Sequence, residues 1–61
     1  MPIVTIDLWS GRTREQKELL AEAITQSMVD ILQVKPETVQ IHYNNVEKNN
    51  WAISGKLQDK N

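Results

Sequence analysis

The chain has 61 residues, a formal net charge of −1 and no cysteine. Disulfides are therefore excluded, and a single histidine argues against a structural zinc cluster. Scattered lysines and arginines give no basic surface for nucleic acid. Without a basic leader or a long apolar run, we expect a cytoplasmic protein with no membrane partner. Residues 1–61 should form a single domain that buries only about 60% of its unfolded surface and gains stability by assembly.

The first predicted element is a β-strand over residues 3–9, where apolar side chains alternate and occupy both faces. Pro2 stands immediately before it, a position at which a strand tolerates proline. Its simplest interpretation is structural. Removal of Met1 would, however, leave Pro2 as a free secondary amine, which is a candidate base.

A helix is predicted to begin after Thr13 and to continue to about Leu32. Thr13 and Gln16 have the spacing of a capping box, in which each side chain accepts a hydrogen bond from the other residue's backbone. Apolar residues then recur at three- and four-residue steps, and we expect this stripe to form the core. Its members are Leu19, Leu20, Ala23, Ile24, Met28, Ile31 and Leu32.

Beyond Pro36, which cannot continue a helix, residues 39–44 alternate between apolar and polar types and predict a second strand that ends in the turn-forming pair Asn44-Asn45. A strand, a long helix and a strand in this order predict parallel pairing. Residues 51–53 are expected to form a small hairpin or to pair with a neighbouring chain. Residues 56–61 are expected to be a polar terminus.

The predicted fold class is therefore α+β: a β-α-β unit with parallel strands and a short C-terminal hairpin. One helix covers only one face of a two-stranded sheet, and such a sheet is not stable alone. We expect two chains to form a four-stranded sheet with two helices on one face, within a larger homo-oligomer.

The sequence resembles the 4-oxalocrotonate tautomerase family over essentially its whole length. The resemblance rests on Pro2 after the initiator methionine, on Gly11-Arg12-Thr13 followed by Glu15-Gln16-Lys17, and on the segment from Asn50 to Gly55. It implies a homohexamer built as a trimer of dimers, no metal or organic cofactor, and a small-molecule carboxylate substrate of the kind found in aromatic degradation.

The resemblance also implies roles for individual residues. Pro2 matches the general base of a keto-enol tautomerase, Arg12 the residue that binds a substrate carboxylate, and Trp51 an aromatic wall of the site. Gln40 occupies the position of a second family arginine, where it offers hydrogen bonds without charge. Family sites draw residues from more than one subunit, so these four need not meet within one chain.

The leading hypothesis is a cofactor-free tautomerase that moves a proton on a small 2-hydroxy-alkenoate or α-keto acid. A protonated Pro2 beside Arg12 could instead serve as the acid of a hydratase, dehalogenase or decarboxylase. A non-catalytic oligomeric binding protein is the third possibility, and the neutral Gln40 is its best support. His42 lacks a carboxylate partner in the sequence pattern and is interpreted as a solvated strand residue.

Overall fold

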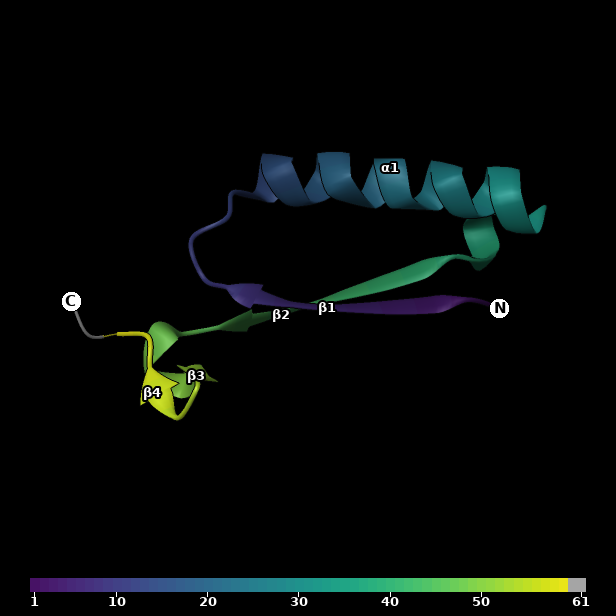
Figure 1. The fold of residues 1–61 in the computed structure, drawn as a ribbon. Coiled ribbons are helices and arrows are strands. Elements are labelled where there is room, and N and C mark those ends of the chain that lie inside the picture. The colour runs from purple at the N-terminus through teal and green to yellow at the C-terminus, as the bar shows by residue number, and fades with distance from the viewer. Residues whose placement is uncertain (60–61) are drawn as a thin grey trace.

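The computed structural model describes residues 1–59 and consists of one helix lying along a two-stranded sheet, with a small hairpin beyond one end of the sheet (Figure 1). The strands are β1 (Ile3–Trp9), β2 (Gln40–Val46), β3 (Ala52–Ile53) and β4 (Lys56–Leu57). The helix is α1 (Arg14–Leu32), and the short 3-10 turns are η1 (Pro36–Thr38) and η2 (Lys48–Asn50). These elements confirm the predicted β-α-β unit with a C-terminal hairpin.

Parallel pairing of β1 with β2 forms the sheet and fixes which residues are neighbours. On the face toward α1, Val4 lies beside Ile41 and Ile6 beside Tyr43, and all four side chains are half-buried. On the opposite face the side chains from Ile3 to Asp7 and from Gln40 to Asn44 are exposed, and no helix among residues 1–59 covers them (Figure 1). The sheet is therefore apolar on the helix side and largely polar on the other.

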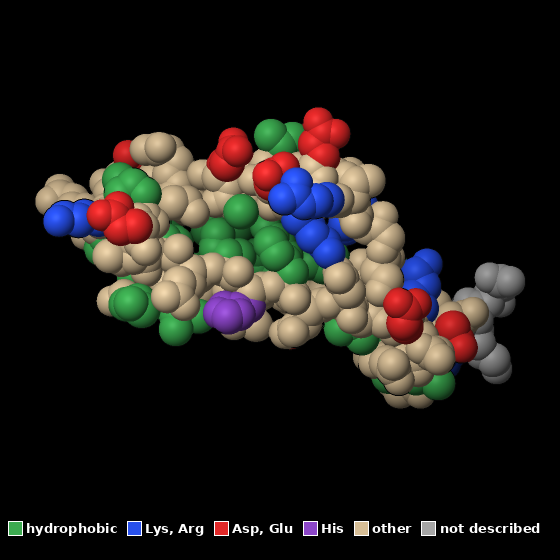
Figure 2. Space-filling model, turned by 180° about the vertical axis from the view of Figure 1, so that it is seen from behind, with side chains coloured by type: hydrophobic (Ala, Val, Ile, Leu, Met, Phe, Trp, Pro, Cys, Tyr) green, Lys and Arg blue, Asp and Glu red, His purple; other side chains and the backbone are tan. Residues whose placement is uncertain are grey.

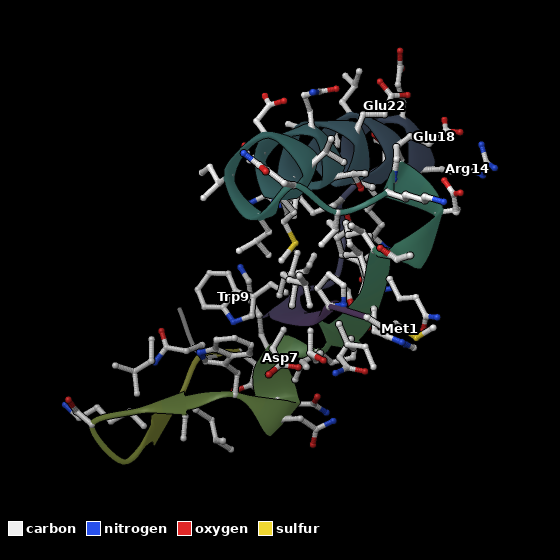
Figure 3. All side chains as sticks on the ribbon, turned by 90° about the vertical axis from the view of Figure 1, so that its right-hand side faces the viewer. Met1, Asp7, Trp9, Arg14, Glu18 and Glu22 are labelled. Carbon is white, nitrogen blue, oxygen red and sulfur yellow. The ribbon has the colours of Figure 1, made fainter. Side chains whose placement is uncertain are left out.

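The second strand is longer than predicted. β2 continues through Asn44 and Asn45 to Val46, and the expected turn at the asparagine pair is wrong. The Asn44 amide donates a hydrogen bond to Asp7 Oδ1 at 2.9 Å, on the side of the sheet away from α1 (Figure 3). This cross-strand bond gives a polar side chain a partner within the ladder, so the local turn preference is overridden.

The helix begins as predicted. The Thr13 Oγ1 accepts a hydrogen bond from the Gln16 backbone N–H, and the Gln16 Oε1 accepts one from the Thr13 N–H, each at 3.0 Å. At the other end Gln33 adopts a left-handed conformation with φ of 57° and closes the helix by donating to the Val29 carbonyl. Both ends of α1 are thus fixed by local hydrogen bonds.

The predicted apolar stripe of α1 is only partly correct. The residues that pack toward the sheet are half-buried and include Ala21, Ile24 and Met28. Leu19 and Ile31 from the predicted stripe are 60% and 78% exposed. Helical spacing identified the apolar residues of α1 but not which of them face this chain's own sheet. No residue among the described ones is fully buried.

The charged side of α1 faces away from the sheet, where Figure 3 shows Arg14, Glu18 and Glu22. Arg14 and Glu18 form an exposed ion pair at 3.4 Å, one helical turn apart. Such a pair contributes only about 0.3–0.5 kcal/mol. Over residues 1–59, no helix combines the length and the hydrophobicity needed to cross a membrane.

The C-terminal segment is more ordered than predicted. Lys56 and Leu57 pair antiparallel with Ile53 and Ala52, and the turn between them uses Ser54 and Gly55 at positive φ. The Gln58 N–H donates to the Trp51 carbonyl at 2.9 Å, which extends the hairpin. Residues 60–61 of the predicted polar terminus lie outside the described part.

The chain exposes more surface than an ordinary monomer of its mass. Its accessible area is 5017 Å² for 7.0 kDa. A compact monomer of that mass exposes about 4,000 Å². The radius of gyration is 14.7 Å. A compact domain of this length has a radius of about 10.5 Å. The fold thus leaves a large apolar area exposed among residues 1–59.

We expect unfolding of this protein to depend strongly on its concentration, because folding and association bury the same apolar surface. A hundredfold dilution should lower the melting temperature by about 10 °C or more. Circular dichroism melts over that concentration range provide the measurement. A melting temperature that does not move with concentration would contradict the need for assembly.

Candidate active site

Arg12 lies in the turn that connects β1 to α1. Gly11 has φ of 116°, in the region that favours glycine, so the chain can reverse sharply there. The Ser10 N–H donates to the Val46 carbonyl at 3.1 Å, and the Ser10 hydroxyl donates to Glu47 Oε2 at 2.6 Å. With the capped helix start on its other side, Arg12 is held between two fixed backbone segments.

A cavity of about 200 Å³ lies beside Arg12, between the first turns of α1 and the sheet. Aliphatic and aromatic side chains form most of its walls, and polar side chains from the start of the helix complete it. The lining residues are Ile6, Leu8, Arg12, Gln16, Lys17, Leu20 and Tyr43. A larger open hollow of about 790 Å³ runs along the hairpin from Gly55 to Asp59, and none of the predicted site residues lines it.

Trp51 packs against Trp9 at this same end of the molecule. The two rings meet edge to face with centroids 5.9 Å apart, and Lys48 Nζ lies 4.8 Å from the centroid of the Trp9 ring. Trp9 Nε1 is buried without a hydrogen-bond partner among residues 1–59. The structure thus places Trp9 directly against Trp51, the predicted aromatic wall.

Pro2 and Gln40 lie together at the other end of the sheet. The Gln40 backbone N–H donates to the Pro2 carbonyl at 3.0 Å, which starts the parallel ladder. The Gln40 side-chain amide reaches the Met1 sulfur at 3.4 Å. Pro2 is half-buried and Gln40 is exposed, so the amide group lies next to the chain's first residues and is open to solvent.

The four predicted residues therefore lie at two ends of the sheet rather than in one cluster. β1 has seven residues. At about 3.3 Å per residue, its length separates the two ends by roughly 23 Å. Figure 1 shows the N-terminus at one end of the sheet and the hairpin at the other. Pro2 and Gln40 cannot meet Arg12 and Trp51 within a single chain.

His42 lies on the exposed face of the sheet, beside Thr5 in the neighbouring strand. This position agrees with its interpretation as a solvated strand residue. In the described part of the chain, His, Asp and Glu side chains do not gather in threes in a way that could hold a metal ion.

Residues 2–61 match the protein-family model described as tautomerase enzyme. A probable tautomerase of Bacillus cereus is 38% identical over 61 residues, which cover 98% of this chain and 100% of that protein. A solved 4-oxalocrotonate tautomerase isozyme of Methylibium petroleiphilum superimposes with a TM-score of 0.91 at 34% identity, covering 95% of this chain and 91% of its own. A 4-oxalocrotonate tautomerase of Chloroflexus aurantiacus gives a TM-score of 0.91 at 25% identity, covering 98% and 97%.

The fold class that these structures share is the small β-α-β unit with a C-terminal hairpin, which is the fold described above. Because the family match spans residues 2–61, the chain belongs to the tautomerase family. It is accordingly an enzyme of the isomerase class, and the family resemblance predicted from the sequence is confirmed. Family membership does not support the alternative of a non-catalytic binding protein.

The contact between Trp9 and Trp51 should contribute measurably to stability. In a double-mutant cycle with Trp9→Leu and Trp51→Leu, we expect a coupling free energy of about 0.5–1.5 kcal/mol, the usual value for an edge-to-face aromatic pair. Denaturant unfolding at one fixed protein concentration gives the four free energies. As a control, Trp51→Leu combined with Gln26→Ala on α1 should be additive. Additivity of the two tryptophan variants would show that the rings do not support one another.

Proposed function

We propose that this enzyme is a cofactor-free keto-enol tautomerase of a small 2-hydroxy-alkenoate or α-keto acid, with Pro2 as its general base. The observation that carries the proposal is the tautomerase match over residues 2–61, which begins at the residue that loss of Met1 would expose. While Met1 is attached, the Pro2 nitrogen belongs to a tertiary amide and has no basic lone pair. Methionine removal is therefore the step that creates the base.

The proposed reaction moves one proton and leaves the substrate's composition unchanged. The Pro2 amine takes the proton from the hydroxyl of the enol, the oxygen forms a carbonyl, and the electrons of the carbon-carbon double bond shift along the chain. The resulting prolyl ammonium returns a proton to carbon. A base for this task works best when its pKa lies near the working pH.

The surroundings proposed for Pro2 favour such a base. A free prolyl amine is more basic than the reaction requires. Apolar side chains on the α1 side of the sheet, such as Leu8, disfavour its charged form by desolvation, and the Arg12 guanidinium disfavours it by repulsion, so both effects lower the pKa of the amine. Arg12 would also orient the substrate by binding its carboxylate.

Assembly provides a route by which Pro2 can reach Arg12. The free edge of β1 can pair antiparallel with β1 of a second chain, and a pairing centred on Ile6 puts Pro2 of one chain opposite Ser10 of the other. Residues opposite one another share a sheet face, so Pro2 would lie on the side that carries α1 and the cavity. Two such sites would form in each dimer.

We propose that three of these dimers form a homohexamer in the cytoplasm. The exposed apolar residues of α1 and the hairpin remain outside the dimer edge and supply further contact area. The Chloroflexus aurantiacus relative is itself described as a heterohexamer, which supports six chains as the assembly size.

Gln40 adapts the site to a substrate with less negative charge at its reacting end. Its side-chain amide reaches the Met1 sulfur, so it lies at the N-terminal end of the sheet, where it could donate a hydrogen bond to the substrate's 2-oxygen. It cannot neutralise a second carboxylate in the way that a guanidinium does. Products of aromatic ring cleavage with one carboxylate near Arg12 are consistent with this arrangement.

Processed enzyme should ketonise 2-hydroxymuconate or phenylenolpyruvate, and Pro2→Ala should lower kcat/KM by about a hundredfold or more, the usual contribution of a positioned base. Ultraviolet absorbance follows the loss of the enol, and the intact mass reports whether Met1 is gone.

An N-terminally extended chain is the matched control, because it keeps the proline ring but converts the nitrogen to an amide. It should be as inactive as Pro2→Ala. Full activity in either protein would rule out Pro2 as the base.

A second candidate function uses the same residues with Pro2 protonated. The neutral, exposed Gln40 amide could position a water molecule instead of an enol oxygen, which would favour hydration, dehalogenation or decarboxylation of a small carboxylate. We expect 3-haloacrylates and malonate semialdehyde to react at least tenfold more slowly than enols, as judged by kcat/KM. The reverse order would favour this second candidate.

A further inference from the structure

The cavity beside Arg12 has a hydrophobic floor and a positively charged rim. Its apolar walls come from Ile6 and Leu8 of β1, Leu20 of α1 and Tyr43 of β2. Figure 2 shows hydrophobic side chains exposed along the opening between helix and sheet, with lysine and arginine side chains, and acidic ones beside them, at one end of this opening. Charge and hydrophobic surface thus meet at one place on the molecule.

The size of the cavity limits what can fill it. Its volume is about 200 Å³. An apolar cavity of about 150 Å³ is large enough to bind benzene. A phenyl ring or a branched four-carbon chain would fit, and both would remove apolar wall area from water. A carboxylate placed against the same walls would lose its hydration and gain no partner there.

Lys17 is the second cation of the rim. Its Nζ lies 5.8 Å from the centroid of the Tyr43 ring, and its backbone carbonyl accepts a hydrogen bond from the Tyr43 hydroxyl at 2.8 Å. These two contacts tie the first turn of α1 to β2 and hold the half-buried Lys17 side chain in place. Among residues 1–59 the ion pair is Arg14 with Glu18, so the carboxylates of this part of the chain neutralise neither Arg12 nor Lys17.

Gln16 adds a neutral donor in a fixed orientation. The capping box uses its Oε1 as the acceptor for the Thr13 N–H. The Nε2 group of the same amide therefore points elsewhere, and it has no hydrogen-bond partner within the described part. A guanidinium, an ammonium and an amide N–H from three residues together form a rim suited to a carboxylate.

We propose that Gln16 and Lys17 are substrate-positioning residues that hold a carboxylate together with Arg12, while the cavity takes an apolar tail. The substrate class is then an α-keto or 2-hydroxy-alkenoic monocarboxylate with an aromatic or branched aliphatic side chain. Its turnover rests on the function proposed for Pro2, but its binding to the cavity does not.

Ligand binding can be measured without turnover in the processed Pro2→Ala assembly. The chain contains a single tyrosine, and Tyr43 lines the cavity, so its ring signals in an NMR spectrum report occupancy directly. The probes are 3-phenylpropanoate, which has one carboxylate and an aromatic tail, and succinate, which has two carboxylates. We expect 3-phenylpropanoate to shift the Tyr43 signals saturably and succinate to bind at least about tenfold more weakly.

Four variants test the rim. Lys17→Met keeps the aliphatic stem and should weaken 3-phenylpropanoate binding about tenfold or more, the effect of losing one hydrogen bond between charged groups. Lys17→Arg should restore binding. Gln16→Glu retains the acceptor needed by the helix cap but repels the carboxylate, so it should also weaken binding. Lys35→Met, which makes the same charge change outside the cavity, should bind like the parent protein.

With Pro2 intact, Lys17→Met should raise KM for phenylenolpyruvate with little change in kcat, because it acts on binding rather than on proton transfer. Unchanged Tyr43 signals, equal affinity for the two probes, or equal binding by Lys17→Met and Lys35→Met would overturn the cavity proposal. Full activity of Pro2→Ala would overturn the proposed base and leave the binding results unaffected.

Discussion

Parallel pairing of β1 with β2 is the constraint on which the other features of this molecule depend. It brings the starts of both strands to one end of the sheet and their carboxyl ends to the other. Pro2 consequently lies beside Gln40, and Arg12 lies at the end of the sheet where Trp9 packs against Trp51. A parallel sheet also needs cover on both faces, and one helix supplies only half of it. The partial burial of the chain and the separation of its predicted site residues therefore have the same origin.

Charge is distributed unevenly along the helix that follows Arg12. Arg14 is paired with Glu18 on the outer face, whereas Lys17 is held against Tyr43 on the inner one. One helical turn thus separates a cation neutralised at the surface from one that faces a hydrophobic cavity. Because the Tyr43 hydroxyl bonds to the Lys17 carbonyl, the second strand fixes this arrangement as well as the helix cap does.

Local signals in the sequence were sufficient for β1 and for the capped start of α1, since each depends on residues close together in the chain. They failed at Asn44, whose turn preference yields to a cross-strand bond with Asp7. They also failed to show which apolar residues of α1 pack on the chain's own sheet. Leu19 and Ile31 have helical spacing whether they pack inside the chain or stay exposed. Residue types in the candidate site were predictable from the family resemblance. The separation of Pro2 from Arg12 and the closeness of Lys17 to Tyr43 were not, because both require the paired strands.

The length of β1 separates Pro2 from Arg12, so a mutation can change one half of the proposed site without changing the other. A copy of this chain that lost Arg12 could still contribute Pro2 to a site shared with a neighbouring chain. A copy without Pro2 could still contribute Arg12. Gene duplication could then yield two chains that each keep one half and are functional only together. A site shared across a strand edge thus provides a simple route from an assembly of identical chains to an obligate mixed one.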